Sequence, residues 1–193
     1  MKIGVLALQG DFQAHMNMFA RMGVSSISVK KPDDLAQISG LVFPGGESTT
    51  HLKLLEESEF KADIARLAER KFPFFGTCAG IILLAKKIVN SAQFSFGVLD
   101  IEVERNAYGT QRESFTESVP IPAFGSPDLE CVFIRAPKIK NISKQVEVIA
   151  SHAENPILIK QGNILGSTFH PELTEDHRVH RLFLEMCKDS LDL

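Results

Sequence analysis

The stretch Phe72–Ala85 most constrains how this chain can fold. An apolar run ends at Gly76, Cys78 follows two residues later, Gly80 comes next, and an apolar helical segment then begins. This Gly-x-Cys-x-Gly pattern is typical of a nucleophile elbow, a sharp strand-to-helix turn that lifts one side chain clear of the sheet. Glycines are needed there because a Cβ does not fit where the strand and helix backbones approach closely.

The chemistry expected of Cys78 follows from that turn. The N–H groups and the dipole of the following helix would favour the thiolate over the thiol. The alternative is a buried structural cysteine between two glycines, which is the common situation for a lone cysteine. The catalytic interpretation therefore needs a base elsewhere in the chain.

Composition limits the class of protein. The 193 residues are 44% hydrophobic and 23% charged, with a net charge of -3, so we expect one globular domain over residues 1–193 that does not bind nucleic acid. We expect no membrane span, because every apolar run is too short and residues 1–8 resemble a buried first strand. Cys78, Cys131 and Cys187 are widely spaced and odd in number, which predicts neither disulfides nor a metal site and favours the cytoplasm.

The first half of the chain alternates strands with helices. Apolar runs predict strands at residues 3–8, 26–29, 41–43 and 72–77, and helical spacing predicts helices at 12–23, around 52–57 and over 60–67. In the second half, residues 99–104 alternate apolar with acidic side chains, and further strands are predicted at 131–134, 146–150, 156–160 and 164–169. A helix with Val179, Leu182, Phe183 and Met186 on its apolar face ends the chain. The predicted fold is a three-layer α/β fold of the flavodoxin-like type, a mostly parallel central sheet flanked by helices with antiparallel strand additions.

His170 is the best candidate for the base. It follows a predicted strand, where open α/β sheets place their sites, and Glu172 stands two residues later. In an extended His-Pro-Glu segment the two side chains share one face, so the carboxylate can fix the imidazole tautomer. A surface histidine near an unrelated glutamate is the alternative.

The other five histidines are weaker candidates. We expect His15 to pack on its helix, and none of the remaining four stands in a His-Pro-Glu segment, namely His51, His152, His177 and His180.

The loop Pro44–Ser48 is the third candidate component. Gly45 and Gly46 follow a predicted strand and would let backbone N–H groups approach a ligand, as an oxyanion hole requires. The alternative is an ordinary glycine turn in which Ser48 caps a helix. The lysine that a phosphate-binding loop requires is missing.

Taken together, these motifs resemble the glutaminase subunit of pyridoxal 5′-phosphate synthase, within the class I (triad) glutamine amidotransferases. The resemblance runs nearly end to end, and the matching segments are Leu6–Phe12, Pro44–Thr49, Phe75–Gly80, Glu104–Asn106, Ser114–Phe115, Phe133–Pro137 and Phe169–Leu173. The elbow and the His-Pro-Glu segment are specific to the amidotransferases, whereas Gly-Glu-Ser-Thr, Arg-Asn and Phe-Ile-Arg-Ala-Pro together are specific to the vitamin B6 branch.

The resemblance implies a role for each matching residue. It implies a Cys78–His170–Glu172 triad and an oxyanion hole formed by the N–H groups of Gly46 and Ala79. It also implies glutamine contacts from Gly46, Glu47, Ser48, Arg105, Ile134 and Arg135. No cofactor is implied.

The implied reaction is hydrolysis of L-glutamine to L-glutamate and ammonia through a cysteine thioester. The ammonia would pass, within a large hetero-oligomer, to a separate synthase subunit. That subunit makes pyridoxal 5′-phosphate from ribose 5-phosphate and glyceraldehyde 3-phosphate. One departure is visible, because Tyr108-Gly109-Thr110-Gln111 stands where Phe-Gly-Arg-Gln is expected.

Two other functions remain open from the sequence. A cysteine hydrolase of the DJ-1 and PfpI type would share the sheet, although those proteins commonly place a histidine directly after the nucleophile, where this chain has Ala79. A catalytically inactive binding subunit is the second alternative. The presence of Cys78, His170 and Glu172 together argues against it.

Overall fold

A seven-stranded sheet forms the centre of the molecule. The computed structural model describes residues 1–8, 10–46, 60–89, 91–105 and 114–190. The sheet order is β10-β11-β12-β4-β3-β1-β2. In that order the strands are β10 Glu147–His152, β11 Asn155–Gln161, β12 Ile164–Ser167, β4 Phe74–Thr77, β3 Gly40–Phe43, β1 Ile3–Leu6 and β2 Ser26–Val29. The five strands from β12 to β2 are parallel, and β11 and β10 are added antiparallel.

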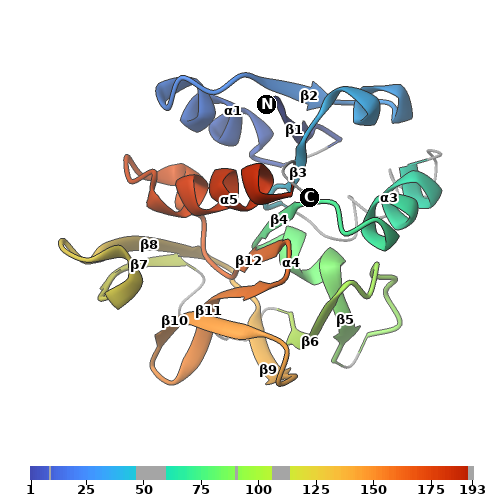
Figure 1. Ribbon diagram of the computed structural model, residues 1–193. Helices are drawn as coiled ribbons and strands as arrows, with labels where there is room; N and C mark the ends of the chain where they lie inside the picture. The colour runs from blue at the N-terminus through green and yellow to red at the C-terminus, as the bar shows by residue number, and fades with distance from the viewer. Residues whose placement is uncertain (9, 47–59, 90, 106–113, 191–193) are drawn as a thin grey trace.

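Helices cover both faces of this sheet. Figure 1 shows α1 (Phe12–Arg21) and α5 (Arg178–Asp189) on one side, with α3 (Phe60–Glu69) and α4 (Ala79–Leu84) on the other. Successive side chains of a strand point to opposite faces, so Phe74 packs with Phe60 and Ile81 while Phe75 packs with Phe19 and Phe183. The result is the predicted three-layer arrangement.

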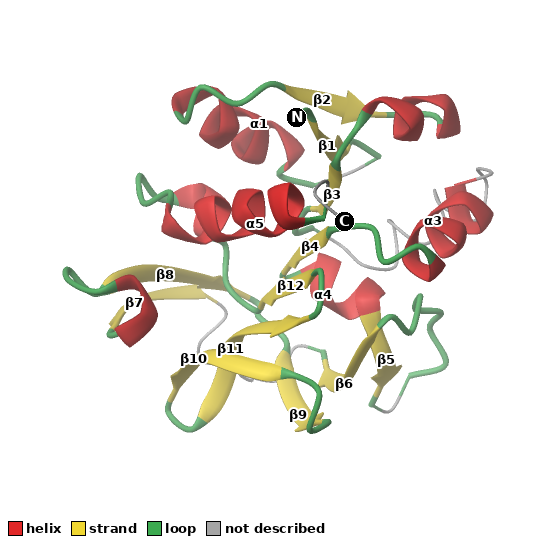
Figure 2. Cartoon of the chain, viewed as in Figure 1, coloured by secondary structure: helices red, strands yellow, loops and turns green. Residues whose placement is uncertain are grey.

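Smaller elements complete the chain. β5 (Ala85–Ile88), β6 (Leu99–Glu104) and β9 (Lys138–Ile142) form a three-stranded sheet, and β7 (Ser114–Val119) pairs with β8 (Leu129–Ile134). Figure 2 shows these strands near the β10–β11 end of the central sheet. The described residues also include three short 3-10 helices, η1 Pro32–Gln37, η2 Pro122–Phe124 and η3 Pro171–Leu173.

The structure confirms the mostly parallel α/β fold and corrects parts of it. The sequence places β12 among the antiparallel additions, but it pairs parallel to β4 and belongs to the parallel core. β5, β7 and β9 were not predicted. β5 was missed because two exposed lysines interrupt its pattern and because it directly follows α4, which has only six residues. The helix predicted around 52–57 lies outside the described residues.

The parallel strands bring three loops to one edge of the sheet. Phe43 is aligned with Gly76, and Ser167 with Thr77, so β3, β4 and β12 end side by side. The residues that follow these three ends are the glycine loop at Gly45, the elbow at Cys78 and the segment at His170. This is the edge at which open α/β sheets bind ligands. Within the described ranges no helix has the length and apolar character to cross a membrane.

Candidate active site

Cys78 stands on a strained turn between β4 and α4. Its φ of 48° and ψ of -104° lie outside the regions that L-residues usually occupy. Its N–H donates a hydrogen bond to the Ser167 carbonyl oxygen at 2.9 Å, which ties the turn to the end of β12. Strain of this kind is held in place by the surrounding structure and is concentrated at functional sites. The side chain is 6% exposed and its Sγ lies 3.6 Å from the carbonyl oxygen of Ile134.

The glycines on either side of Cys78 have no room for a side chain. A Cβ on Gly76 would lie 2.8 Å from the carbonyl carbon of Gly80. A Cβ on Gly80 would lie 2.0 Å from the carbonyl oxygen of Phe43. Backbone atoms cannot move aside as the end of a flexible side chain can, so the close approach of β4, α4 and β3 requires glycine at both positions.

His170 and Glu172 lie together at the start of η3. The His170 backbone N–H donates to the Val132 carbonyl oxygen at 2.8 Å, which fixes the segment against β8. The His170 Nδ1–H donates to Glu172 Oε1 at 2.8 Å, and both residues are 3% exposed. The bond leaves Nε2 of the ring as the nitrogen that can exchange a proton with another group.

Buried charges set the protonation of this pair. Burial by itself lowers the pKa of His170, but hydrogen bonds with Cys78 and Glu172 outweigh it and raise the pKa to about 10. Burial raises the pKa of Glu172, but His15 and His170 together bring it well below its usual value. At neutral pH the arrangement therefore favours an ionised Glu172 and a positively charged His170 beside Cys78.

The glycine loop packs directly on the imidazole. A Cβ on Gly45 would lie 2.3 Å from Cε1 of His170. The Gly45 carbonyl oxygen accepts a hydrogen bond from the Asp11 N–H at 3.4 Å, so the N–H of Gly46, on the same trans peptide, points the opposite way. Gly46 has a φ of 138°, which L side chains rarely adopt. Ala79 is the first residue of α4, and its N–H therefore has no acceptor within the helix.

The residues expected to contact glutamine are only partly placed together. Ile134 lies beside the Cys78 sulfur, and the next residue, Arg135, is exposed with a φ of 43°. Arg105 follows β6 and donates a hydrogen bond to Gln93 Oε1 at 2.6 Å. Glu47 and Ser48 lie outside the described residues, as does the departure at residues 108–111.

His15 was expected only to pack on its helix, but it reaches the carboxylate of Glu172. Its Nε2 lies 3.5 Å from Glu172 Oε1 and 3.2 Å from Thr77 Oγ1, and its Nδ1 lies 2.9 Å from Nε2 of His180. Both histidines are fully buried. Its position in the sequence could have indicated this contact, because His15 lies in the first turn of the helix that follows the first strand, next to the edge where the site forms.

One cluster offers ligand atoms that a cation could use. Single atoms of Asp11, His170 and Glu172 lie within 4.8 Å of one another. His170 and Glu172 are joined by a hydrogen bond, whereas Asp11 is exposed.

The comparison with known families decides what kind of protein carries this site. Residues 5–189 match the SNO glutamine amidotransferase family. This chain belongs to that family. A relative in Thermotoga petrophila, pyridoxal 5′-phosphate synthase subunit PdxT, is 51% identical over 97% of this chain and 100% of its own length. A protein of the same name in Koribacter versatilis is 50% identical over 98% of this chain and 97% of its own length.

Solved structures agree with the family assignment. A crystal structure described as a glutamine amidotransferase has a TM-score of 0.91 and 45% identity, covering 96% of this chain and 98% of its own. A glutamine amidotransferase from Thermotoga maritima, with a TM-score of 0.60 and 19% identity over 100% of this chain and 84% of its own, shares the fold. Membership of an amidotransferase family decides against the DJ-1 and PfpI type of hydrolase.

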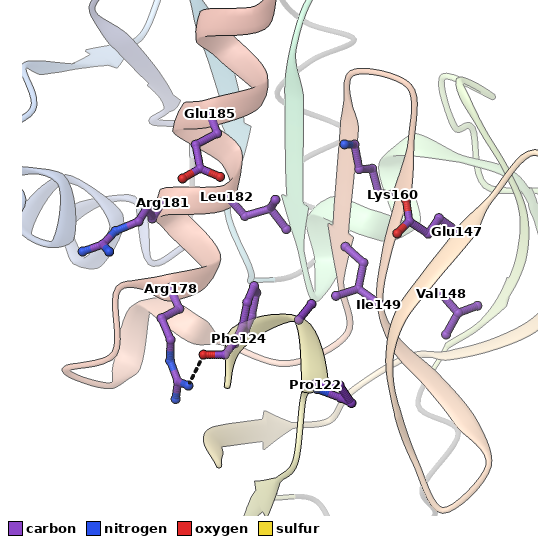
Figure 3. A pocket seen from close by; sticks show the side chains of 11 residues that line it. Pro122, Phe124, Glu147, Val148, Ile149, Lys160, Arg178, Arg181, Leu182 and Glu185 are labelled. Carbon is purple, nitrogen blue, oxygen red and sulfur yellow. Dashed lines mark hydrogen bonds between the residues drawn. The ribbon is translucent and has the colours of Figure 1, made fainter. Parts of the chain in front are cut away.

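A separate groove of about 540 Å³ lies between η2, the β10–β11 pair and α5 (Figure 3). Arg178 lines it, and its guanidinium donates to the carbonyl oxygens of Phe124 at 3.3 Å and Pro127 at 2.7 Å and pairs with Asp176. Arg178 therefore holds the β7–β8 connection against the start of α5. The residues that line this groove do not include any of those predicted for the active site.

Proposed function

We propose that this amidotransferase hydrolyses L-glutamine to L-glutamate and ammonia and supplies the ammonia to a synthase subunit that makes pyridoxal 5′-phosphate. The observation that carries the proposal is the combination of a cysteine elbow with a buried His–Glu pair in a chain half identical to named PdxT subunits over nearly its full length. The synthase would build the product from ribose 5-phosphate and glyceraldehyde 3-phosphate. The proposed assembly is a large hetero-oligomer in the cytoplasm, where the three free cysteines would stay reduced.

The first half of the reaction begins at Cys78. The thiolate attacks the side-chain amide carbon of glutamine and forms a tetrahedral intermediate. The N–H groups of Gly46 and Ala79 would receive the negative charge that develops on the amide oxygen. His170, protonated as its raised pKa favours, donates its proton to the departing nitrogen, the C–N bond breaks and ammonia leaves a γ-glutamyl thioester on Cys78.

The second half reverses the roles of the histidine. Neutral His170 takes a proton from water, and the hydroxyl attacks the thioester carbon. Collapse of the second tetrahedral intermediate releases glutamate and returns the thiolate. Glu172 keeps the imidazole in one tautomer and stabilises its positive form through both steps.

Recognition of the amino acid end of glutamine is assigned to the surrounding loops. Arg105 and Arg135 suit the α-carboxylate, since guanidinium groups bind carboxylates through paired hydrogen bonds. Ile134 places its carbonyl oxygen next to the nucleophile. Glu47 and Ser48 complete the proposed set together with Gly46.

The test uses glutamine labelled with ¹⁵N at the side-chain amide, given to the chain in the presence of its synthase partner. The wild-type pair should place ¹⁵N in pyridoxal 5′-phosphate, and Cys78→Ala should make product only when an ammonium salt is added. Cys131→Ala is the matched control, because its thiol is buried in β8 and should not affect turnover. Glutamine-dependent product from Cys78→Ala would rule out Cys78 as the nucleophile.

A further inference from the structure

A chain of buried polar side chains continues behind the triad. His15 on α1 contacts Glu172 on one side and His180 on α5 on the other, and Thr77 at the end of β4 lies against the same nitrogen of His15 as Glu172. These residues are at most 3% exposed. Aromatic rings enclose the two imidazoles, since Phe75 meets both edge-on and Phe19 meets His180. Side chains of β4, α5 and η3, which are distant from α1 in the sequence, thus meet at His15.

The position of the protons in this chain can be inferred. Burial takes the pKa of His180 well below its ordinary value, so His180 is neutral and has one donor and one acceptor nitrogen. Its Nδ1 has no hydrogen-bond partner among the described residues. An orphaned buried acceptor is tolerated better than an orphaned N–H, so the proton belongs on Nε2 and is donated to Nδ1 of His15.

The tautomer of His15 follows from that of His180. Because Nδ1 of His15 accepts from His180, its N–H is at Nε2, which faces Glu172 Oε1 and the Thr77 hydroxyl oxygen. The opposite tautomer would turn a bare lone pair toward a buried carboxylate, which is repulsive. The nearer of these two acceptors is the Thr77 hydroxyl oxygen at 3.2 Å, and Glu172 Oε1, which also receives the His170 Nδ1–H, lies at 3.5 Å. The N–H of His15 is therefore shared between the hydroxyl and the carboxylate.

Glu172 needs such a second donor. A carboxylate removed from water is costly unless hydrogen bonds replace its hydration, and Oε2 has no partner among the described residues. Oε1 is therefore the atom through which the protein holds this charge, between an imidazole on each side. Glu172 stands in a three-residue 3-10 helix, so neighbouring side chains and not a regular element must fix its orientation.

We propose that His15 is a positioning residue for the glutaminase reaction, fixing the Glu172 carboxylate through its Nε2–H while Thr77 and His180 fix His15. This role rests on the triad proposed above. His15 does not touch glutamine; it acts on the reaction only through Glu172 and hence His170. It is a further participant in the reaction, supplied by the helix that follows the first strand.

A double-mutant cycle with the synthase present tests the proposal. His15→Leu puts an apolar side chain of similar size in place of the imidazole and so removes the N–H donor. We expect kcat for glutamine hydrolysis to fall about tenfold, equivalent to about 1.4 kcal/mol, with little change in KM. His15→Gln can place an amide N–H near Glu172 and should recover most of the loss. In the Glu172→Gln variant, adding His15→Leu should cause no further fall in kcat.

Controls separate positioning from folding. Met18→Ala removes packing from a buried site on the same helix without a polar contact to Glu172, so it should lower the melting temperature and leave kcat unchanged. If His15→Leu lowered kcat by the same factor in the Glu172→Gln variant as in wild type, His15 would act independently of Glu172, and the proposal would be overturned. An equal loss in His15→Gln and His15→Leu, tracking melting temperature as in Met18→Ala, would reduce His15 to a packing residue. Wild-type turnover in Glu172→Gln alone would instead refute the triad, and the role of His15 with it.

Discussion

Replacing Gly45 with alanine would place one methyl group against the ring of His170. The added Cβ would lie 2.3 Å from Cε1 and 2.9 Å from Nδ1, whereas ordinary contact begins at 3.4 Å. Gly45 is not among the glycines with positive φ, so alanine can adopt its backbone conformation and the conflict falls on the ring. In a close-packed interior the imidazole must then move by about an ångström.

A displacement of that size is enough to disturb the hydrogen bond between His170 and Glu172. The His170–Glu172 hydrogen bond is 2.8 Å long, and its geometry depends on where the ring sits. Misplacing a catalytic group by about 1 Å lowers the rate by about a hundredfold. We therefore expect Gly45→Ala to keep the fold and to lower kcat by about that factor.

The assay is ammonia release from glutamine with the synthase partner at saturation, accompanied by thermal unfolding of each variant. Gly4→Ala is the control, because its Cβ would meet only the ends of the Ile38 and Val29 side chains, at 2.6 and 2.8 Å. It stresses packing near the start of β1, away from the edge where Gly45 lies. A wild-type kcat in Gly45→Ala, or an equal loss of kcat in Gly4→Ala, would refute the reasoning.

Four further predictions follow from the same site. Glu172→Gln should slow glutamine hydrolysis by roughly two to four orders of magnitude yet leave residual activity, because it removes the charge that supports His170; an unchanged rate would mean that another group orients the ring. Iodoacetamide should label Cys78 in the folded protein and spare Cys131 and Cys187, whose thiols have pKa values raised to about 12 by burial; mass spectrometry of the labelled peptides checks this, and early labelling of the buried pair would contradict it. Because the pKa of His170 is raised to about 10, protonated His170 stabilises the fold fully below pH 6.5, and this contribution is lost as the pH rises to about 10. Urea unfolding should therefore show a steeper fall in the free energy of unfolding over that pH range for wild type than for His170→Asn. Parallel curves would contradict the charge assignment. Glutamine hydrolysis at fixed enzyme should rise as the synthase partner is titrated in, because the glycine loop allows a peptide unit to turn toward or away from the oxyanion; a flat titration with full activity at the start would exclude such a gate.

The features that could be predicted from sequence are those specified locally. The elbow is encoded within five residues by Gly76, Cys78 and Gly80, and the carboxylate partner of His170 is only two residues away. The apolar runs and the alternation in residues 99–104 similarly give β1, β2 and β6 close to their observed bounds.

The features that were missed depend on residues distant in the sequence. His15 and His180 are 165 positions apart, and only the packing of α1 and α5 on the same face of the sheet brings them together. The parallel pairing of β12 with β4 is also a tertiary outcome, since short turns on its N-terminal side suggest an antiparallel neighbour and correctly describe β11. Periodicity gives the existence of a strand but not its partner on the other side.

The insertion of β12 beside β4 has a consequence for the growing polypeptide during translation. The elbow and its thiol are complete by residue 80, but the strand that anchors the Cys78 N–H and delivers His170 begins at Ile164. A nascent or truncated chain that stops before this strand contains Cys78 without His170, and so has the proposed nucleophile without the proposed base. On the proposed mechanism, glutamine hydrolysis must then wait until β12 has been made and has entered the sheet between β11 and β4.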